Sequence, residues 1–125
     1  MTTCTLRLSF GADLREEAVQ VLRTLVGPVR SQPGCSQTLL MCDVQDAAVI
    51  TWVSRWRSRP DLDRHLRTTH FRRLLALMEL AAETPDVVFE ECGELRGLDL
   101  IHEVIGGADD SRSPHVSDLE SNLPT

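Results

Sequence analysis

Residues 35–57, CSQTLLMCDVQDAAVITWVSRWR, decide the fold of this chain. Residues from Cys35 to Val44 favour a strand, and apolar side chains fall on both of its faces: Leu39 and Met41 on one, and Leu40, Cys42 and Val44 on the other. The pattern predicts a strand buried on both faces. The polar pair Gln45-Asp46 then predicts a hairpin turn. In the following segment, Ala48 to Arg57, four alternating residues share one face: Ile50, Trp52, Ser54 and Trp56. The stretch therefore predicts two antiparallel strands, the second of which carries both tryptophans.

The segment before this hairpin predicts a strand followed by a helix. Residues 3–10 alternate between apolar and polar side chains, which is the period of a half-buried strand. Asp13, with Glu16 three residues later, matches a capping box at a helix start. Apolar residues at helical spacing then extend a helix from about residue 14 towards residue 30.

The segment after the hairpin, residues 60–83, predicts a helical region that allows two interpretations. If the helix is unbroken, His70 belongs to the apolar stripe and points at the sheet. If the helix breaks at Thr68-Thr69, His65 turns inward instead. The sequence leaves both interpretations open.

Beyond residue 85, one further strand and a change of composition are predicted. Residues 87–92 begin with Val-Val-Phe and are expected to form the fourth strand. Residues 98–105 form another apolar segment, expected as a short strand or as an arm laid on a partner. We expect one domain over residues 1–105 and a disordered tail over residues 106–125, where too little apolar surface is present to offset the ordering entropy.

The order strand, helix, strand, strand, helix, strand predicts an α+β fold of the ferredoxin-like kind. In this split βαβ arrangement, an antiparallel four-stranded sheet carries two helices on one face. The other face of the sheet would be left uncovered in a monomer. We therefore expect a homodimer in which two sheets pack face to face.

Composition and charge exclude several classes of protein. Of the 125 residues 42% are hydrophobic, but no apolar run reaches the roughly 20 residues of a membrane helix. The first residues lack the features of a secretory signal, so we expect a cytoplasmic protein without a membrane partner. A net charge of −6 argues against nucleic acid as a partner.

Seven arginines and two aspartates between Arg55 and Arg73 give that stretch a local charge of +5. A solvated helix face explains these charges, and a site mouth that attracts an anionic small molecule is the alternative.

The absence of two residue types excludes several kinds of catalysis. The chain has no lysine and no tyrosine, which excludes Schiff-base catalysis, a Walker-type phosphate loop and phenol acid–base roles. The four cysteines lack the paired spacing of zinc sites. We expect no metal and no cofactor.

Several of these residues resemble the pattern of the antibiotic biosynthesis monooxygenase family. The likeness covers about residues 3–95 and rests on a Pro33-Gly34-Cys35 turn, Trp56 at the end of the third strand, Leu62 and His65 early in the next helix, and His70-Phe71 after them. The resemblance implies a dimeric α+β barrel. Several members of that family oxidise aromatic or quinol-type substrates with molecular oxygen without flavin or metal.

The resemblance also implies roles for particular side chains. His65 matches the family histidine and, with His70, is a candidate catalytic base, because the pKa of histidine lies near neutral pH. Trp56, Trp52 and Phe71 are candidates for the substrate-binding wall that excludes water. A structural role is the alternative: local hydrogen bonding or solvation for the histidines, each of which taken alone it explains better, and core packing for the tryptophans, which is favoured for Trp52.

Two departures from the family pattern bear on the chemistry. Ser54 stands where an acidic residue is usual, which removes a carboxylate that could orient a base. Leu75 stands near the position where the haem-degrading branch of the fold has a histidine, which disfavours that branch. Two functions remain: a cofactor-independent monooxygenase acting on a small aromatic, anthrone or quinol-type substrate, and a non-catalytic dimeric module that binds a small ligand or assists a pathway.

Overall fold

The computed structural model describes residues 1–91 and 98–106. Its elements are β1 (Thr2–Ser9), α1 (Ala12–Arg30), β2 (Cys35–Cys42), β3 (Val49–Trp56), α2 (Arg59–Leu66), α3 (Thr69–Glu79), β4 (Asp86–Glu91) and α4 (Leu98–Gly106). The chain separates into two units, residues 1–93 and 94–125, and the first contains the whole sheet.

The four strands form one antiparallel sheet in the order β2-β3-β1-β4. Trp52 in the middle of β3 pairs with Leu6 on one side and with Leu40 on the other, so these three side chains share a face. The order of the strands and the helices between them make this the predicted ferredoxin-like α+β fold.

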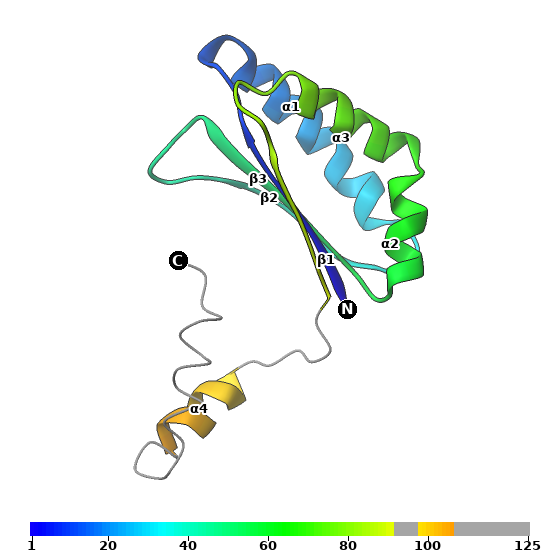
Figure 1. Ribbon diagram of the computed structural model, residues 1–125, viewed down its shortest axis with the longest axis vertical. Coiled ribbons are helices and arrows are strands. Elements are labelled where there is room, and N and C mark those ends of the chain that lie inside the picture. Colours follow the sequence, from blue (N-terminus) through cyan, green and yellow to red (C-terminus); the bar gives the residue numbers. More distant parts are fainter. Residues whose placement is uncertain (92–97, 107–125) are drawn as a thin grey trace. The chain divides into compact units, whose positions relative to one another are not determined.

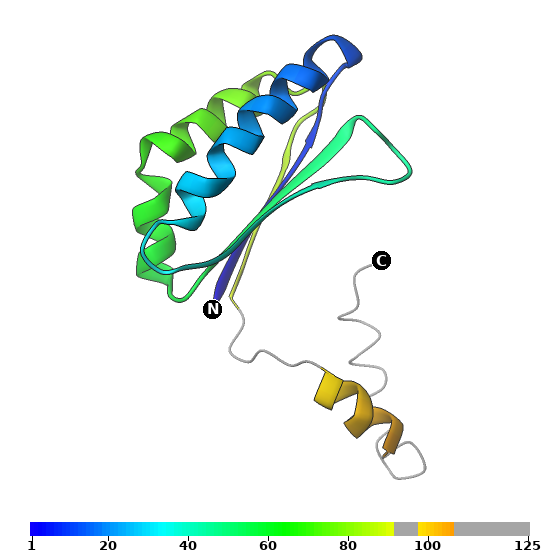
Figure 2. The same cartoon turned by 180° about the vertical axis from the view of Figure 1, so that it is seen from behind.

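The helices α1, α2 and α3 lie on one face of the sheet, as Figures 1 and 2 show from opposite sides. The core between these layers is apolar because alternate strand residues and one stripe of each helix point into it. Its largest fully buried members include Trp52, Trp56, Phe10, Leu6, Leu22 and Leu74. The other sheet face carries no helix of this unit.

The first helix begins earlier than the sequence predicts. Its N-cap is Gly11, which makes no side-chain cap hydrogen bond, and Asp13 lies within the first turn. The expected capping box at Asp13 and Glu16 is therefore wrong. Asp13 still has a favourable position, because a carboxylate near the helix N-terminus interacts with the positive end of the helix dipole.

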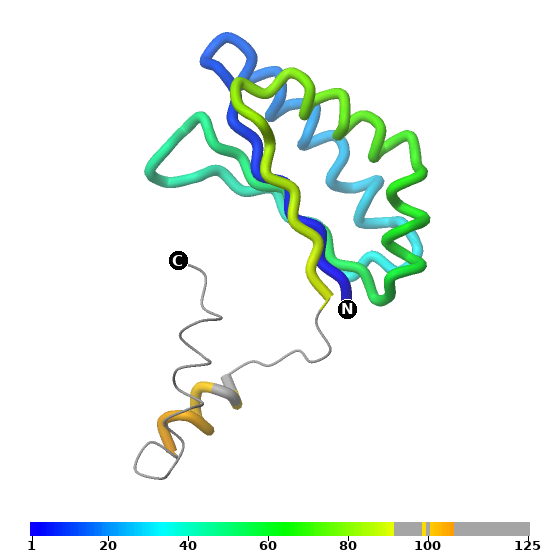
Figure 3. The backbone as a smooth tube through the Cα atoms, viewed as in Figure 1, coloured from blue at the N-terminus to red at the C-terminus, as the bar shows by residue number. Residues whose placement is uncertain are grey.

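The second helical region is broken, as one of the two sequence interpretations required. The backbone trace in Figure 3 turns between α2 and α3. Ser58 caps α2 by accepting a hydrogen bond from Asp61 N at 3.4 Å, and Thr68 caps α3 by accepting one from Phe71 N at 3.3 Å. Each helix thus has its own cap, which explains why the region does not continue as one rod.

Strand β2 is less buried than the sequence predicts. Only Thr38 is fully buried, while Met41 and Cys42 at its end are exposed. Val44 belongs to the loop and is fully exposed, because the strands end at Cys42 and begin again at Val49. The alternation predicted the strand itself correctly but not the exposure of its outer half, since β2 is an edge strand.

The second unit contains α4, so the expected short strand at residues 98–105 is wrong. Ile101 and Ile105 lie four residues apart on this helix and are both exposed. No helix among the described residues is long and apolar enough to cross a membrane. Residues 107–125 of the expected tail lie outside the described residues, so this domain boundary stays a prediction.

Gly34 links α1 to β2 in a conformation that other residues rarely adopt. Its φ is +81°, and a Cβ at this position would collide with the Asp61 side chain. We expect Gly34→Ala to lower the free energy of unfolding by about 2 kcal/mol, from backbone strain and this collision. Urea unfolding would measure the change, and the exposed neighbour Ser36→Ala serves as the control. A loss below about 0.5 kcal/mol would contradict the strained geometry.

Candidate functional site

His65 lies under the helices, in the last turn of α2, with 1% of its surface exposed. Its ring stacks on Trp56 at the end of β3, with ring centroids 4.5 Å apart and planes 22° apart. Phe71 from α3 meets the same ring edge-on at 5.3 Å. Three elements therefore hold one imidazole between two aromatic side chains.

Gln32, in the turn between α1 and β2, connects the two candidate histidines. Its Oε1 lies 2.9 Å from His65 Nδ1, and its Nε2 lies 3.5 Å from His70 Nδ1. An amide oxygen only accepts hydrogen bonds, so His65 Nδ1 must carry a proton and donate it to Gln32. His70, which is half-buried, accepts from the amide nitrogen.

The other ring nitrogen of His65, Nε2, is buried and has no hydrogen-bond partner. With the proton on Nδ1, Nε2 carries a free lone pair. The indole nitrogen of Trp52 is also buried without a partner, whereas that of Trp56 donates to Ser54 Oγ at 3.0 Å. The apolar layer thus holds one unused acceptor and one unused donor.

Burial controls the protonation of His65. Loss of solvation lowers the pKa of His65 to about 4, and the nearby His70 adds a smaller effect in the same direction. A charged imidazolium would lose most of its hydration between Trp56 and Phe71, and no described carboxylate bonds to the ring to compensate it. His65 is therefore neutral at pH 7.

The structure brings together only part of the predicted site. His65, Trp56 and Phe71 are in contact, while His70 reaches His65 only through Gln32. Trp52 is fully buried in the core. Sequence analysis does not identify Gln32, because the residue lies next to the Pro33-Gly34 turn and no local pattern marks its contacts with the two histidines.

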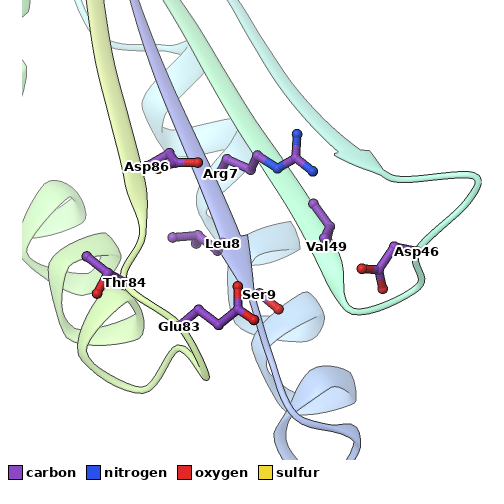
Figure 4. Close-up of a pocket in the computed structure, with 8 residues that line it drawn as sticks. All are labelled: Arg7, Leu8, Ser9, Asp46, Val49, Glu83, Thr84 and Asp86. Atoms are coloured by element: carbon purple, nitrogen blue, oxygen red, sulfur yellow. The ribbon is translucent and has the colours of Figure 1, made fainter.

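Two cavities lie elsewhere in the first unit. One, of about 270 Å³, is drawn in Figure 4 and is lined by polar residues from β1, the β2–β3 loop, the segment before β4 and the first residue of β4: Arg7, Ser9, Asp46, Glu83, Thr84 and Asp86, with Leu8 and Val49. The other, of about 110 Å³, is apolar and lies between α1 and α3. Neither is lined by His65 or Trp56.

The arginine-rich stretch forms ion pairs on the helix surface at several positions. Arg59 pairs with Asp63 at 2.9 Å and with Glu91 at 3.4 Å, and Arg64 pairs with Asp61 at 3.5 Å. These exposed pairs favour the interpretation as a solvated helix face. Within the part of the chain that the structure describes, no group of three His, Cys, Asp or Glu residues could hold a metal ion.

The sheet and the covering helices define a protein of the ferredoxin-like α+β class, with His65 buried in an aromatic cluster. The sequence of the chain gives the family. A family model described as antibiotic biosynthesis monooxygenase matches residues 1–77. The chain therefore belongs to the antibiotic biosynthesis monooxygenase family.

Solved structures share this fold at low sequence identity. A crystal structure of an antibiotic biosynthesis monooxygenase is 24% identical, with a TM-score of 0.67, and the match covers 75% of this chain and all of that one. Rv0793 from Mycobacterium tuberculosis is 22% identical, with a TM-score of 0.70 and coverages of 77% and 98%. A variant of SnoaB, a cofactor-independent oxygenase from Streptomyces nogalater, is 18% identical, with a TM-score of 0.63 and coverages of 75% and 94%.

A curated relative also matches part of the chain. The uncharacterised protein sll1783 from Synechocystis is 29% identical over 76 residues, which are 61% of this chain and 48% of the relative. The chain therefore spans about half the length of the curated relative it matches.

The low pKa of His65 predicts an acid-sensitive fold. Between pH 6.5 and about 4 the unfolded chain binds a proton on this ring and the folded chain does not, so stability rises with pH in this window and is lost as pH falls. Up to about 3 kcal/mol of the free energy of unfolding is expected to disappear between pH 6.5 and 4 from this group.

Urea unfolding of the wild type and His65→Phe at several pH values measures this contribution. The variant keeps an aromatic ring at this position but cannot titrate, so its loss over the same window should be smaller by about that amount. His102→Gln, in exposed α4, should behave like the wild type. Parallel curves for the wild type and His65→Phe would show that His65 titrates normally.

Proposed function

We propose that the chain is a cofactor-independent monooxygenase that oxidises a small aromatic substrate of the anthrone or quinol type, with His65 as the proton acceptor. One observation carries the proposal: His65 presents a buried, unpartnered Nε2 between Trp56 and Phe71. Fixed aromatic walls suit a flat substrate, and an unused lone pair suits a group that gives up a proton.

The reaction balances with molecular oxygen as the only co-reactant. An anthrone loses a proton from the carbon opposite its carbonyl to His65 Nε2, and the resulting anion transfers an electron to oxygen. The radical pair recombines with formation of a carbon–oxygen bond. The imidazolium returns its proton to the peroxide formed. The same carbon then loses its second hydrogen as a proton while the oxygen–oxygen bond breaks, so that one oxygen atom remains as the second carbonyl of the anthraquinone and the other leaves as hydroxide, which this proton converts to water.

The low pKa of His65 limits this chemistry. Transfer of a proton from a group with a pKa of about 10 to one of about 4 costs roughly 8 kcal/mol. Attraction between the imidazolium and the substrate anion in a dry site offsets part of that cost. The remainder is compatible with turnover, since barriers near 17 kcal/mol still allow about one event per second.

A non-catalytic ligand-binding module of the same fold is the second candidate. The close packing of the site favours it: Trp52, Trp56 and His65 are each at most 1% exposed, so a ligand would need the covering helices to move. Ser54, bound to the Trp56 indole, also leaves the site without the carboxylate that could hold an imidazolium.

Oxygen uptake by flavin-free and metal-free protein decides between these functions. Against a panel of anthrones and quinols, we expect uptake above the blank for the wild type and a loss of at least about 100-fold for His65→Gln, which removes the basic nitrogen. His102→Gln is the matched control on α4. Uptake that survives His65→Gln would remove His65 as the base, and no uptake with any substrate would favour the ligand-binding module.

We further propose that two copies pair through the helix-free face of the sheet, in the cytoplasm. Register places Met41, Val53 and Val88 on that face, and two of them are more than 40% exposed. Pairing would bury these apolar side chains. Cys4, Cys35 and Cys42 are free thiols, as suits a reducing compartment.

Charge placed on this face is expected to separate the dimer. Met41→Glu combined with Val88→Glu would bring four carboxylates into the interface without replacing a core residue, and sedimentation velocity should show a shift from dimer to monomer. Leu75→Glu is the matched control, because Leu75 is equally exposed (41%) but lies on α3. A wild type that sediments as a monomer at all concentrations would refute the pairing.

A further inference from the structure

We propose that Gln32 is the positioning residue of this site: it holds the proton of His65 on Nδ1, so that Nε2 faces any ligand as an acceptor. The consequence for catalysis rests on the function proposed above. The position of the proton does not, because it follows from contacts within this chain.

The amide orientation follows from the His65 end, because His70 Nδ1 can either accept from the amide or donate to it. The oxygen of Gln32 lies 2.9 Å from His65 Nδ1, and its nitrogen lies 3.5 Å from His70 Nδ1. In the reverse orientation the amide nitrogen would donate to His65 Nδ1, and the proton of His65 would move to Nε2. That nitrogen is buried without a partner, so the reverse orientation would leave a buried N–H donor unpaired. Orphaned buried donors are rarer in proteins than under-used acceptors.

The backbone holds Gln32 in place from both directions. Its N–H donates to Val29 O at the end of α1 at 3.1 Å, and its carbonyl accepts from Cys35 N at the start of β2 at 3.1 Å. Pro33 follows directly and fixes its own φ. These contacts fix the position of the Gln32 backbone relative to the sheet, which suits a residue that orients another.

This arrangement selects a chemical class of ligand. His65 is neutral and offers a lone pair, so a hydroxyl group that donates a hydrogen bond is favoured, and a carboxylate anion finds neither charge nor donor there. The favoured ligand is therefore a neutral hydroxylated aromatic compound.

The position of the proton can be measured directly by NMR on protein labelled with ¹⁵N in its histidine rings, at pH 7 and without substrate. For the wild type we expect His65 to show a protonated Nδ1 and an unprotonated Nε2. Gln32→Glu keeps an acceptor oxygen and should keep Nδ1 protonated, while its carboxylate raises the His65 pKa and favours a second proton on Nε2. Gln32→Leu removes the acceptor and should give a neutral ring with Nε2–H or a mixture. Gln20→Leu, on the exposed face of α1, is the matched control.

Each result has a distinct meaning. A wild-type His65 protonated on Nε2, or a Gln32→Leu spectrum identical to that of the wild type, would overturn the role of Gln32. A protonated Nδ1 in Gln32→Glu would show that an oxygen acceptor, and not merely the packing of the turn, holds this proton. If the pattern is as expected but no oxygen uptake is found, the proposed oxidation fails and the assignment of Gln32 stands.

The ligand class is tested with 1-naphthol and 1-methoxynaphthalene, which differ in the single hydrogen-bond donor. We expect 1-naphthol to bind the wild type at least about tenfold more tightly than 1-methoxynaphthalene does. The shift of the His65 Nε2 signal during titration measures the binding of each compound. Gln32→Leu should reduce this preference. Equal binding of the two compounds, or no binding of either, would overturn the ligand class.

Discussion

The interruption between α2 and α3 is the constraint on which the site depends. His65 and Phe71 are six residues apart, which on an unbroken helix would place them about 120° apart around its axis. Thr68 interrupts the helix between these two residues. Its hydroxyl caps α3 and also donates a hydrogen bond to the carbonyl of His65 at 2.7 Å. The chain changes direction there, so that Phe71 can contact the His65 ring that stacks on Trp56.

The site carries polar atoms that a purely structural core would avoid. A buried polar group without a partner costs on the order of 1 to 3 kcal/mol, and the covered sheet face holds two, on Trp52 and His65. Phenylalanine at either position would pack without that cost. The neighbouring Ser54 shows that the same layer can satisfy an indole, since it accepts from Trp56. A third buried atom without a partner, Arg55 Nε, lies on the helix-free face.

The strands could be predicted from sequence because burial on one face imposes a period of two, as residues 3–10 and 48–57 show. The phase of the second helical region could not be predicted, because the unbroken and the broken helix each give an apolar stripe. The hydroxyl of Thr68, which caps α3, decides between them. Gln32 escaped prediction for a different reason. Its partners are 33 and 38 residues away, and no local pattern encodes such contacts.

The edge strand β4 exposes an apolar triplet. Val87, Val88 and Phe89 are between 40% and 49% exposed, and neither a proline nor a bulge interrupts their backbone. Such an edge can recruit further strands and begin aggregation. Charge opposes the pairing of further strands here, because Asp86 precedes the apolar triplet and two glutamates follow it. The colloidal behaviour of the chain therefore depends on three carboxylates at an edge that backbone geometry leaves open.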